Sequence, residues 1–340
     1  MAEQRKPAIA LYGVGQYGLE VARIAISKGF PIVAAYNRAG EKVGRDVGAL
    51  AGIGRDLGVV VQDAELADYT GSGADIAVVT VSDSLRRNMP AYERLLGNGI
   101  NVICHGTESY YPFGLDPENA ARIDAIAKQN GVTYTGSGIW DVSRIWSGIL
   151  AASASTRIDG LFHKSITDAE RIGLKLMKLC GVGMSQDEFA QKMGQKDGKP
   201  TGLYMTIPHQ VLDALGYTVT DVTEHREPVL WDEPIHCRLL ERDIPPGEAA
   251  GIRMVAVAHT KEGVTARAEI ELRVFREGEV ENMLWRVDGR PGTKLVFERD
   301  DSVHFSAASL FNRIPDVIAA PPGVQPIRTL GMMRHSALVG

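Results

Sequence analysis

A glycine-rich segment near the N-terminus has the spacing of a phosphate-binding turn. Its residues are Gly13, Val14, Gly15, Gln16, Tyr17 and Gly18, which fit the pattern G-x-G-x-x-G. An apolar run at residues 8–12 precedes the segment, and helical periodicity over residues 16–28 follows it. In such a unit the first glycine permits a tight turn, the second lets the backbone approach a pyrophosphate, and the third allows close helix–strand packing. Free N–H groups at the helix N-terminus then attract the phosphates. We predict that this segment binds a nicotinamide dinucleotide.

The end of the second predicted strand distinguishes NADP from NAD. An NAD site carries an acidic side chain about 20 residues after the glycines, which binds the 2′-hydroxyl of the adenosine ribose. Here the strand ends in Asn37 and Arg38, without a carboxylate. Asn37 can donate a hydrogen bond to a 2′-phosphate, and Arg38 can pair with it, with Lys42 as a further cation. We predict NADP, with NAD as the alternative cofactor. The competing interpretation of Arg38 is a solvated turn residue.

A carboxylate follows the fifth predicted strand, at a place suited to proton chemistry. His105, Gly106, Thr107 and Glu108 come directly after the apolar residues 102–104. Ligands of open α/β sheets bind beyond the carboxyl ends of the strands. We therefore expect His105 and Gly106, with Ser82 after the fourth strand, to lie along the cofactor. Glu108 would then act in general acid–base catalysis. On these residues alone, Glu108 could equally be a solvated loop acid, and Ser82 a cap of the next helix.

Several segments together resemble the native amine dehydrogenases, which are relatives of 2,4-diaminopentanoate dehydrogenase in the broad dihydrodipicolinate-reductase-like class. They are the glycine motif, the turn 105–108, the stretch GSGIWD at 136–141 and the tail NRIPDVIAAPPG at 312–323. The resemblance covers nearly the whole chain and implies that Glu108 is the catalytic carboxylate. It also implies reductive amination of ketones or aldehydes with ammonia and NAD(P)H, the reverse deamination of primary amines, and a homodimer.

The residues that surround the substrate carry a weaker signal. We place four there, although each could instead be an ordinary core residue: Trp140, Trp146, Tyr204 and Thr206. An aromatic lining suits small apolar carbonyl compounds. A diamino acid would need a cation for its carboxylate, which Arg144 and Lys164 could supply. The segment LFHKS at 161–165 lacks the paired histidines of dihydrodipicolinate reductase, so we expect His163 and Lys164 to be ordinary strand residues. Two alternatives remain: an amino-acid dehydrogenase of the 2,4-diaminopentanoate type, and a non-catalytic NAD(P)-binding redox sensor.

The elements that position these residues fall into two groups. Up to about residue 150, short apolar runs alternate with helical stretches, which is typical of a parallel sheet covered on both faces. Later segments such as 264–275 alternate apolar and polar residues, which predicts antiparallel strands with one wet face. Such a sheet favours pairing with its twin in a two-fold dimer. We predict an α/β protein with an N-terminal Rossmann domain and doubly wound parallel sheet at 1–150, a C-terminal α+β substrate and dimerisation domain with a largely antiparallel sheet at 151–305, and a helix and tail at 306–340 that pack back on the Rossmann domain.

The overall composition is that of an ordinary globular protein. The chain has 340 residues, of which 44% are hydrophobic and 23% charged, and its net charge is −5. We expect no nucleic-acid partner, because no run of lysine or arginine stands out. We expect no membrane segment or signal peptide either, since the longest apolar run is far shorter than the about 20 residues of a membrane span. The three cysteines lack metal-binding spacing, so we predict reduced thiols, no metal and a cytoplasmic protein.

Overall fold

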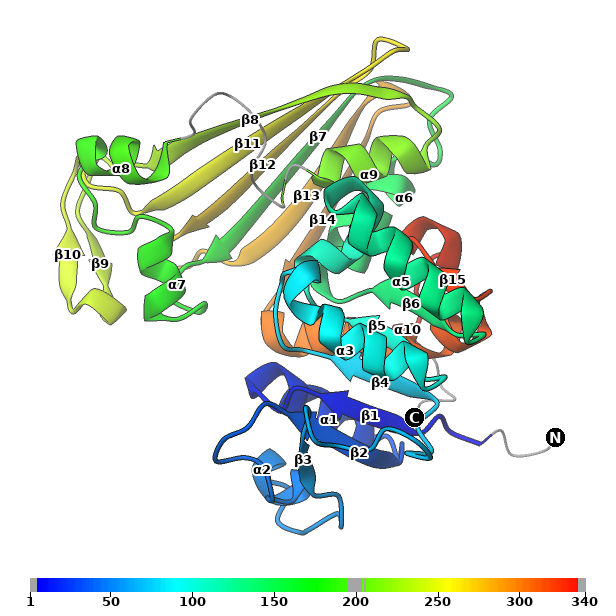
Figure 1. Ribbon diagram of the computed structural model, residues 1–340. Helices are drawn as coiled ribbons and strands as arrows, with labels where there is room; N and C mark the ends of the chain where they lie inside the picture. The colour runs from blue at the N-terminus through cyan, green and yellow to red at the C-terminus, as the bar shows by residue number, and fades with distance from the viewer. Residues whose placement is uncertain (1–4, 195–203, 205, 336–340) are drawn as a thin grey trace. The chain divides into compact units, whose positions relative to one another are not determined.

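The chain forms two compact units. The computed structural model describes residues 5–194, 204 and 206–335 (Figure 1). The first unit consists of residues 1–142 and 301–340, and the second of residues 143–300. The sequence-based boundaries at 150 and 305 differ from these by several residues. At the second boundary the helix begins earlier than its apolar spacing suggested, because the side chain of Asp301 caps it by accepting a hydrogen bond from the N–H of His304.

The first unit is a parallel sheet with helices on both faces. Its strands lie in the order β15 (Gly323–Val324), β6 (Thr133–Gly136), β5 (Asn101–Cys104), β4 (Ile76–Val79), β1 (Ile9–Tyr12), β2 (Ile32–Asn37) and β3 (Val61–Asp63). All of these pairings are parallel. Its helices are α1 (Gln16–Ser27), α2 (Val47–Ala51), α3 (Leu85–Gly97), α4 (Pro112–Leu115), α5 (Pro117–Gln129) and α10 (Ser302–Ala319). The strand order reverses beside β1, where doubly wound sheets bind their ligands.

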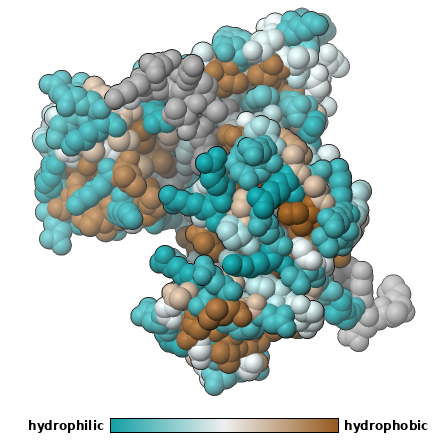
Figure 2. Space-filling model, viewed as in Figure 1, coloured by the Kyte–Doolittle hydropathy of each residue, from teal (hydrophilic) through white to brown (hydrophobic). Residues whose placement is uncertain are grey.

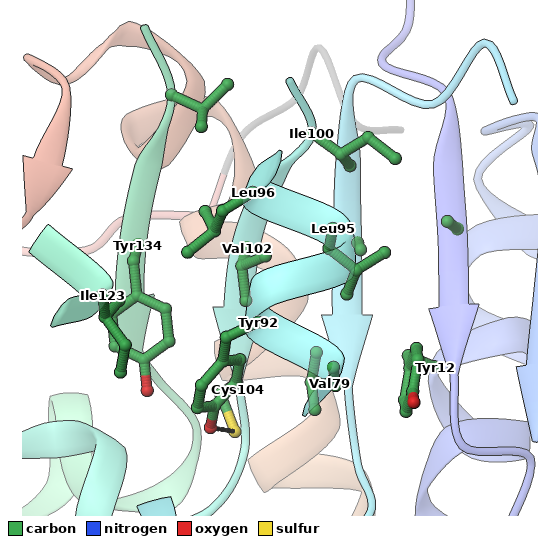
Figure 3. Close-up of a cluster of buried hydrophobic side chains, with 14 of the residues drawn as sticks. Tyr12, Val79, Tyr92, Leu95, Leu96, Ile100, Val102, Cys104, Ile123 and Tyr134 are labelled. Atoms are coloured by element: carbon green, nitrogen blue, oxygen red, sulfur yellow. Dashed lines mark hydrogen bonds between the residues drawn. The ribbon is translucent and has the colours of Figure 1, made fainter. Parts of the chain in front are cut away.

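Each face of this sheet has its own apolar core. On one face, α3 and α5 bury side chains such as Tyr92, Leu95 and Ile123 against the strands (Figure 3). On the other face, α1 and α10 pack together, α1 against β1 and β2 and α10 against β5 and β6, with the ring of Phe311 4.7 Å from that of Phe30. Helix α10 therefore belongs to the first unit although it follows the second in the chain. The strands are buried on both faces, which explains why they appear in the sequence as short continuous apolar runs.

The second unit is built on a largely antiparallel sheet. Its strands lie in the order β14 (Thr293–Arg299), β13 (Glu281–Arg290), β7 (Arg157–Asp168), β12 (Thr265–Arg273), β11 (Gly251–Thr260) and β8 (Val219–Val229). Only the pairing of β7 with β12 is parallel among these strands. A small hairpin of β9 (Ile235–Cys237) and β10 (Arg242–Ile244) is separate from this sheet. The helices are α6 (Ser147–Ala152), α7 (Leu174–Leu179), α8 (Gln186–Met193) and α9 (Thr206–Ala214). Together with the first unit, this arrangement confirms the predicted fold class.

The two faces of the second sheet differ in chemistry. Helices α9 and α6 pack on one face, where Ala268 and Ile270 of β12 and Trp285 of β13 are buried. The alternate positions form the other face, which we call the polar face; its residues include Phe162, Lys164 and Ile166 of β7, Arg253 of β11, Arg267, Glu269 and Glu271 of β12, Leu284 and Arg286 of β13, and Val296 of β14. The buried Glu271 accepts from Lys164 at 3.0 Å and from Arg253 at 2.9 Å. This pairing offsets the cost of burying a carboxylate.

One end of the second unit exposes apolar side chains. Figure 1 shows α7, α8 and the β9–β10 hairpin gathered there. Leu174, Leu176 and Leu179 of α7 are exposed, and Figure 2 shows apolar atoms over this helix. Within the described ranges, no helix has the length and apolar character needed to cross a membrane.

Candidate active site

The glycine-rich segment forms the turn between β1 and α1. Gly13 has a φ of +106°, and a side chain there would meet the Oγ1 atom of Thr80. A side chain at Gly18 would clash with the carbonyl oxygen of Gly13. Gly15, by contrast, caps α1 and faces open space. The first and third glycines are thus required by the turn itself, whereas the second leaves room above the helix N-terminus, as a phosphate site needs.

A cavity of about 580 Å³ opens beside this turn. Among the predicted cofactor residues, Gly13, Gly15, Asn37 and Arg38 line it, together with Lys42 from the segment after β2. Asn37 Oδ1 accepts a hydrogen bond from the N–H of Val14 at 3.4 Å, and Lys42 Nζ donates to the carbonyl oxygen of Val14 at 2.8 Å. Val14 is fully buried, and these two bonds hold its backbone N–H and its carbonyl oxygen. Gln16 is exposed at the start of α1 and does not line the cavity.

The turn after β5 is clamped onto the turn after β4. A side chain at Gly106 would clash with the carbonyl oxygen of Ser82, so only glycine allows this approach. The N–H of Thr107 donates to Asp83 Oδ1 at 3.1 Å, and the N–H of Glu108 donates to the carbonyl oxygen of Asp83 at 3.1 Å. Ser82 Oγ accepts from the N–H of Ser84 at 3.1 Å, which is a local turn contact, whereas the N-cap residue of α3 is Ser84.

Glu108 lies at the N-terminus of α3. Its Oε2 atom accepts a hydrogen bond from the N–H of Leu85 at 2.5 Å, whereas Ser84, the N-cap residue, makes no side-chain capping bond. Glu108 is partly exposed. A carboxylate is favoured at the positive end of a helix, and this contact fixes its orientation. The carboxylate therefore has both a structural contact and access to solvent, and it lies in the first unit with the cofactor cavity.

A buried hydrogen-bond network lies next to this turn. Cys104 Sγ accepts from Tyr92 Oη at 3.1 Å, as Figure 3 shows, and from the N–H of Gly106 at 3.3 Å. Tyr92 Oη also lies 3.1 Å from Ser109 Oγ, and Asn88 Nδ2 donates to the carbonyl oxygen of Ser82 at 2.8 Å. Burial raises the pKa of the Cys104 thiol, which is therefore protonated at neutral pH. All three cysteines have free thiols and are buried. No sequence pattern singles out Tyr92 and Asn88, which support the turn from the amphipathic helix α3.

Aromatic side chains cluster beside the same turn. The ring of Tyr17 lies 3.8 Å from that of His105. The hydroxyl of Tyr17 is 2.9 Å from Ser306 Oγ of α10. Burial lowers the pKa of His105, so the imidazole is neutral at pH 7. Trp140, one of the predicted substrate residues, is buried with its ring 5.6 Å from that of Tyr110. Tyr17 thus contacts both His105 and α10, and neither Tyr17 nor His105 is among the residues that line the described cavity.

A buried ion pair holds the chain next to Trp140. Arg313 of α10 donates to both oxygens of Asp141, at 2.9 and 2.7 Å, and both side chains are fully buried. Ser137 Oγ donates to Asp141 at 2.8 Å. Such a bidentate pair has a fixed geometry and therefore orients the segment between Ser137 and Asp141. This ion pair joins two of the segments on which the family resemblance depends, the stretch at 136–141 and the tail at 312–323.

The other predicted substrate residues lie in the second unit. Trp146 ends a π-helical turn at Asp141–Trp146, Tyr204 lies under the guanidinium of Arg144 at 5.0 Å, and Thr206 Oγ1 at the start of α9 accepts from Gln210 at 3.1 Å. Arg144 Nη2 donates to Ser165 Oγ, whereas Lys164 points from the opposite face of β7 toward Glu271. Arg144 and Lys164 therefore do not form one cation site, because alternate residues of a strand face opposite sides.

Comparison with known proteins identifies the class and then the family. A family model described as the 2,4-diaminopentanoate dehydrogenase C-terminal domain matches residues 148–339. The 2,4-diaminopentanoate dehydrogenase of Acetoanaerobium sticklandii is 24% identical over 279 residues, which are 78% of this chain and 76% of that protein. The structure of an amine dehydrogenase from Mycobacterium smegmatis matches with a TM-score of 0.85 at 30% identity, covering 99% of both chains. A probable dehydrogenase from Thermotoga maritima shares the fold, with a TM-score of 0.58 at 13% identity over 95% of this chain and 92% of that one.

The fold and these likenesses define an oxidoreductase with a Rossmann-type nucleotide-binding domain. The chain belongs to the family of 2,4-diaminopentanoate dehydrogenase and the amine dehydrogenases similar to it, which confirms the resemblance seen in the sequence. Among the residues that the structure describes, no group of three or more histidine, cysteine, aspartate or glutamate side chains is arranged to hold a metal ion.

Proposed function

We propose that this protein is an NADP-dependent amine dehydrogenase, which reductively aminates a ketone or aldehyde with ammonia and deaminates the primary amine in reverse. The position of Glu108 is the observation that carries the proposal. Its carboxylate is held at the N-terminus of α3 by the N–H of Leu85. It lies on a turn in which Gly106 packs closely against the backbone of Ser82. Membership of the amine dehydrogenase family supports the same assignment.

The chemistry needs a group that both takes and returns a proton. Glu108 takes a proton from ammonium, so that ammonia can attack the carbonyl carbon. The same carboxyl group then protonates the hydroxyl of the carbinolamine, which leaves as water and forms an iminium ion. The regenerated carboxylate stabilises the positive charge of that ion. The reduced nicotinamide, when bound, supplies the hydride that converts the iminium carbon to the amine.

The proposed preference for NADP rests on the end of β2. Asn37 and Arg38 line the cavity where an NAD site would carry an acid. Arg38 is exposed, and within the described part of the chain its guanidinium takes part in no hydrogen bond or ion pair. It is therefore available to a 2′-phosphate. Glu41 and Glu65 also line the cavity, but neither occupies the strand end at which the ribose hydroxyls are recognised.

A spectrophotometric screen tests the proposed reaction. NADPH oxidation is followed with a panel of ketones and aldehydes, with ammonium chloride present or replaced by sodium chloride. We expect oxidation that requires ammonium and gives a primary amine, identified by mass spectrometry. Oxidation without ammonium would indicate a carbonyl reductase instead. Turnover confined to keto acids would favour the amino-acid dehydrogenase, and tight NADPH binding without turnover of any substrate would favour the redox sensor.

A further inference from the structure

Helix α3 forms a second wall of the cofactor cavity. Its cavity-lining residues are Arg87, Asn88, Pro90, Ala91 and Arg94. Positions 87, 90, 91 and 94 follow the spacing of three, four and seven residues that places side chains on one helical face. The first wall is the segment after β2, which contains Arg38. Because α3 follows β4, and β4 and β2 are the two neighbours of β1, the two walls lie on either side of β1, where the glycine-rich turn begins. The small side chain of Ala91 leaves space between them.

The cavity contains more positive than negative side chains. Arg38 and Lys42 come from the segment after β2, and Arg87 and Arg94 come from α3. Two of these cations already have partners in the protein. Lys42 Nζ donates to the carbonyl oxygen of Val14 at 2.8 Å, and Arg94 Nη1 donates to Tyr12 Oη at 3.3 Å. The remaining two are the candidates for binding an anionic ligand.

The guanidinium groups of Arg38 and Arg87 are alike in their exposure and in their lack of a partner among the described residues. Both side chains are exposed, and over the described residues neither guanidinium takes part in a hydrogen bond or ion pair. The ordinary explanation of one such residue is a solvated surface arginine. Two of them on separate walls of one cavity have a common use if the ligand is a dianion, because a guanidinium binds phosphate oxygens through two parallel N–H bonds.

We propose that Arg87 is a second binding residue for the 2′-phosphate of NADP, given the cofactor preference proposed above. Arg38 contacts the phosphate from the β2 side, and Arg87 contacts it from α3. NAD carries a neutral hydroxyl at this position and gains little from either guanidinium. Arg87 thus contributes to the discrimination between the two cofactors, together with the absence of an acidic side chain at position 37.

The neighbouring Arg86 provides a matched control. It is also an exposed arginine in the first turn of α3, but it lies in a different hollow with Glu93, Glu118 and Arg122. The experiment measures the affinity of the full-length protein for NADPH and for NADH, by fluorescence of the bound nicotinamide at constant ionic strength. We expect Arg87→Ala to weaken NADPH binding about 10- to 100-fold, the range of one charge-assisted hydrogen bond. The same variant should change NADH binding by less than about 3-fold, and Arg86→Ala should change neither.

Other outcomes would overturn the assignment in distinguishable ways. Equal weakening of NADPH and NADH by Arg87→Ala would mean that Arg87 contacts the adenine or the pyrophosphate, which both cofactors share. Unchanged NADPH affinity would make Arg87 a solvated surface residue. A parent protein that binds NADH tightly and NADPH weakly would overturn the proposed cofactor preference and this assignment with it. Because binding is measured without an amine or carbonyl substrate, failure of the proposed amination reaction leaves the experiment interpretable.

Discussion

Glu108 has a structural role, as acceptor for the N–H of Leu85, and a proposed catalytic role in proton transfer. A substitution can separate the two roles. Glu108→Gln retains a carbonyl oxygen that can accept from the N–H of Leu85, so the start of α3 should remain capped. The amide cannot take a proton from ammonium or neutralise an iminium ion. We expect turnover to fall about 100- to 10,000-fold in both directions, while NADPH affinity stays nearly unchanged. Amination rates from NADPH absorbance and affinity from nicotinamide fluorescence measure the two effects. Retained turnover would make Glu108 only a helix cap.

The prediction for Arg38 concerns cofactor choice. Arg38→Asp replaces a cation that faces the cavity by an anion that repels a 2′-phosphate and can accept from a 2′-hydroxyl. We expect NADPH to bind at least about 10-fold more weakly, whereas NADH binding should be equal or tighter. Titration of both cofactors against the parent and the variant measures this. Unchanged NADPH affinity with weakened NADH binding would contradict the assignment.

The site residues that the sequence revealed belong to local patterns, and those it missed do not. Gly13, Gly15 and Gly18 form a motif within one turn, and Glu108 follows a recognisable strand. Tyr92 and Arg87 lie on α3, whose sequence indicates an amphipathic helix without showing which residues face the cavity or the turn after β5. Their roles depend on contacts between segments distant in the sequence, such as that of Tyr92 with Cys104. Spacing within one helix does not contain this information.

At the scale of elements, prediction succeeded where a periodic pattern had distinct ends. The helical periodicity over residues 117–129 predicts α5, which occupies Pro117–Gln129, and Ser185, a residue type that favours N-caps, caps α8 through a capping box with Glu188. The spacing of apolar residues over 169–179 likewise predicts one helix, and this prediction is wrong for the first part of the segment. The N–H of Ala169 donates to the carbonyl oxygen of Arg273 and thus continues the sheet contact, and only Leu174–Leu179 is helical. Gly173 has a φ of +87°, which separates the two conformations.

The short strands were missed for a related reason. Strands β9, β10 and β15 contain only two or three residues each, too few for alternation to be recognised. Strand β14 alternates between partly exposed and exposed residues up to its buried end at Arg299, so it lacks a clear apolar stripe. Its pairing with β13 follows from the hairpin between them, which is a tertiary property of both strands together.

Strand β7 carries a titratable side chain whose burial predicts a pH dependence of stability. His163 is fully buried against Trp285, and burial, with the nearby Arg144, lowers its pKa to about 3. In the unfolded chain the pKa of histidine is about 6.5. As the pH falls below about 6.5, the unfolded state therefore binds a proton that the folded state does not, and the protein loses stability until the folded pKa is reached.

The variant His163→Asn isolates this contribution. An asparagine side chain can still donate to the carbonyl oxygen of Leu284, which lies 3.0 Å from His163 Nδ1, but it does not titrate. Between pH 7.5 and 5.0, we expect the parent to lose about 2 kcal/mol more unfolding free energy than the variant. Urea unfolding at the two pH values measures the difference. Parallel losses in parent and variant would show that another group controls the acid sensitivity.

At the scale of the whole molecule, the chain completes the first unit only after it has built the second. Helix α10 returns to pack on α1, and its Arg313 binds Asp141 close to where the chain leaves the first unit. Removal of the residues after 300 would therefore deprive the first unit of part of its core and leave Asp141 buried without this partner. A buried charge that loses its partner is strongly destabilising. The nucleotide-binding unit is thus not the contiguous N-terminal segment that its motif suggests.

The polar face of the second sheet is the surface that we propose for self-association. Its ion pairs are interleaved with the partly buried Phe162, Ile166 and Leu284 and with the exposed Val296. A two-fold axis would place the same apolar positions of two copies against each other, while the interleaved charged residues stay paired within each subunit. A solvated sheet of a monomer is the competing interpretation, and it predicts that substitutions on this face leave the molecular mass unchanged.

Two glutamate substitutions distinguish a dimer on this face from other states. Phe162 pairs across strands with Arg267 of β12 and Arg286 of β13, so Phe162→Glu introduces an anion that both arginines can bind within one subunit. The fold should therefore tolerate it, whereas a two-fold interface would lose two apolar rings, one from each copy, and would have to bury two carboxylates in their place. Leu176→Glu on the exposed face of α7 is the control, since it removes a comparable apolar side chain outside the polar face. By size-exclusion chromatography with light scattering at low micromolar concentration, we expect a dimer for the parent and for Leu176→Glu, and a monomer for Phe162→Glu. A monomeric parent would refute self-association, and a dimeric Phe162→Glu together with a monomeric Leu176→Glu would move the interface to α7.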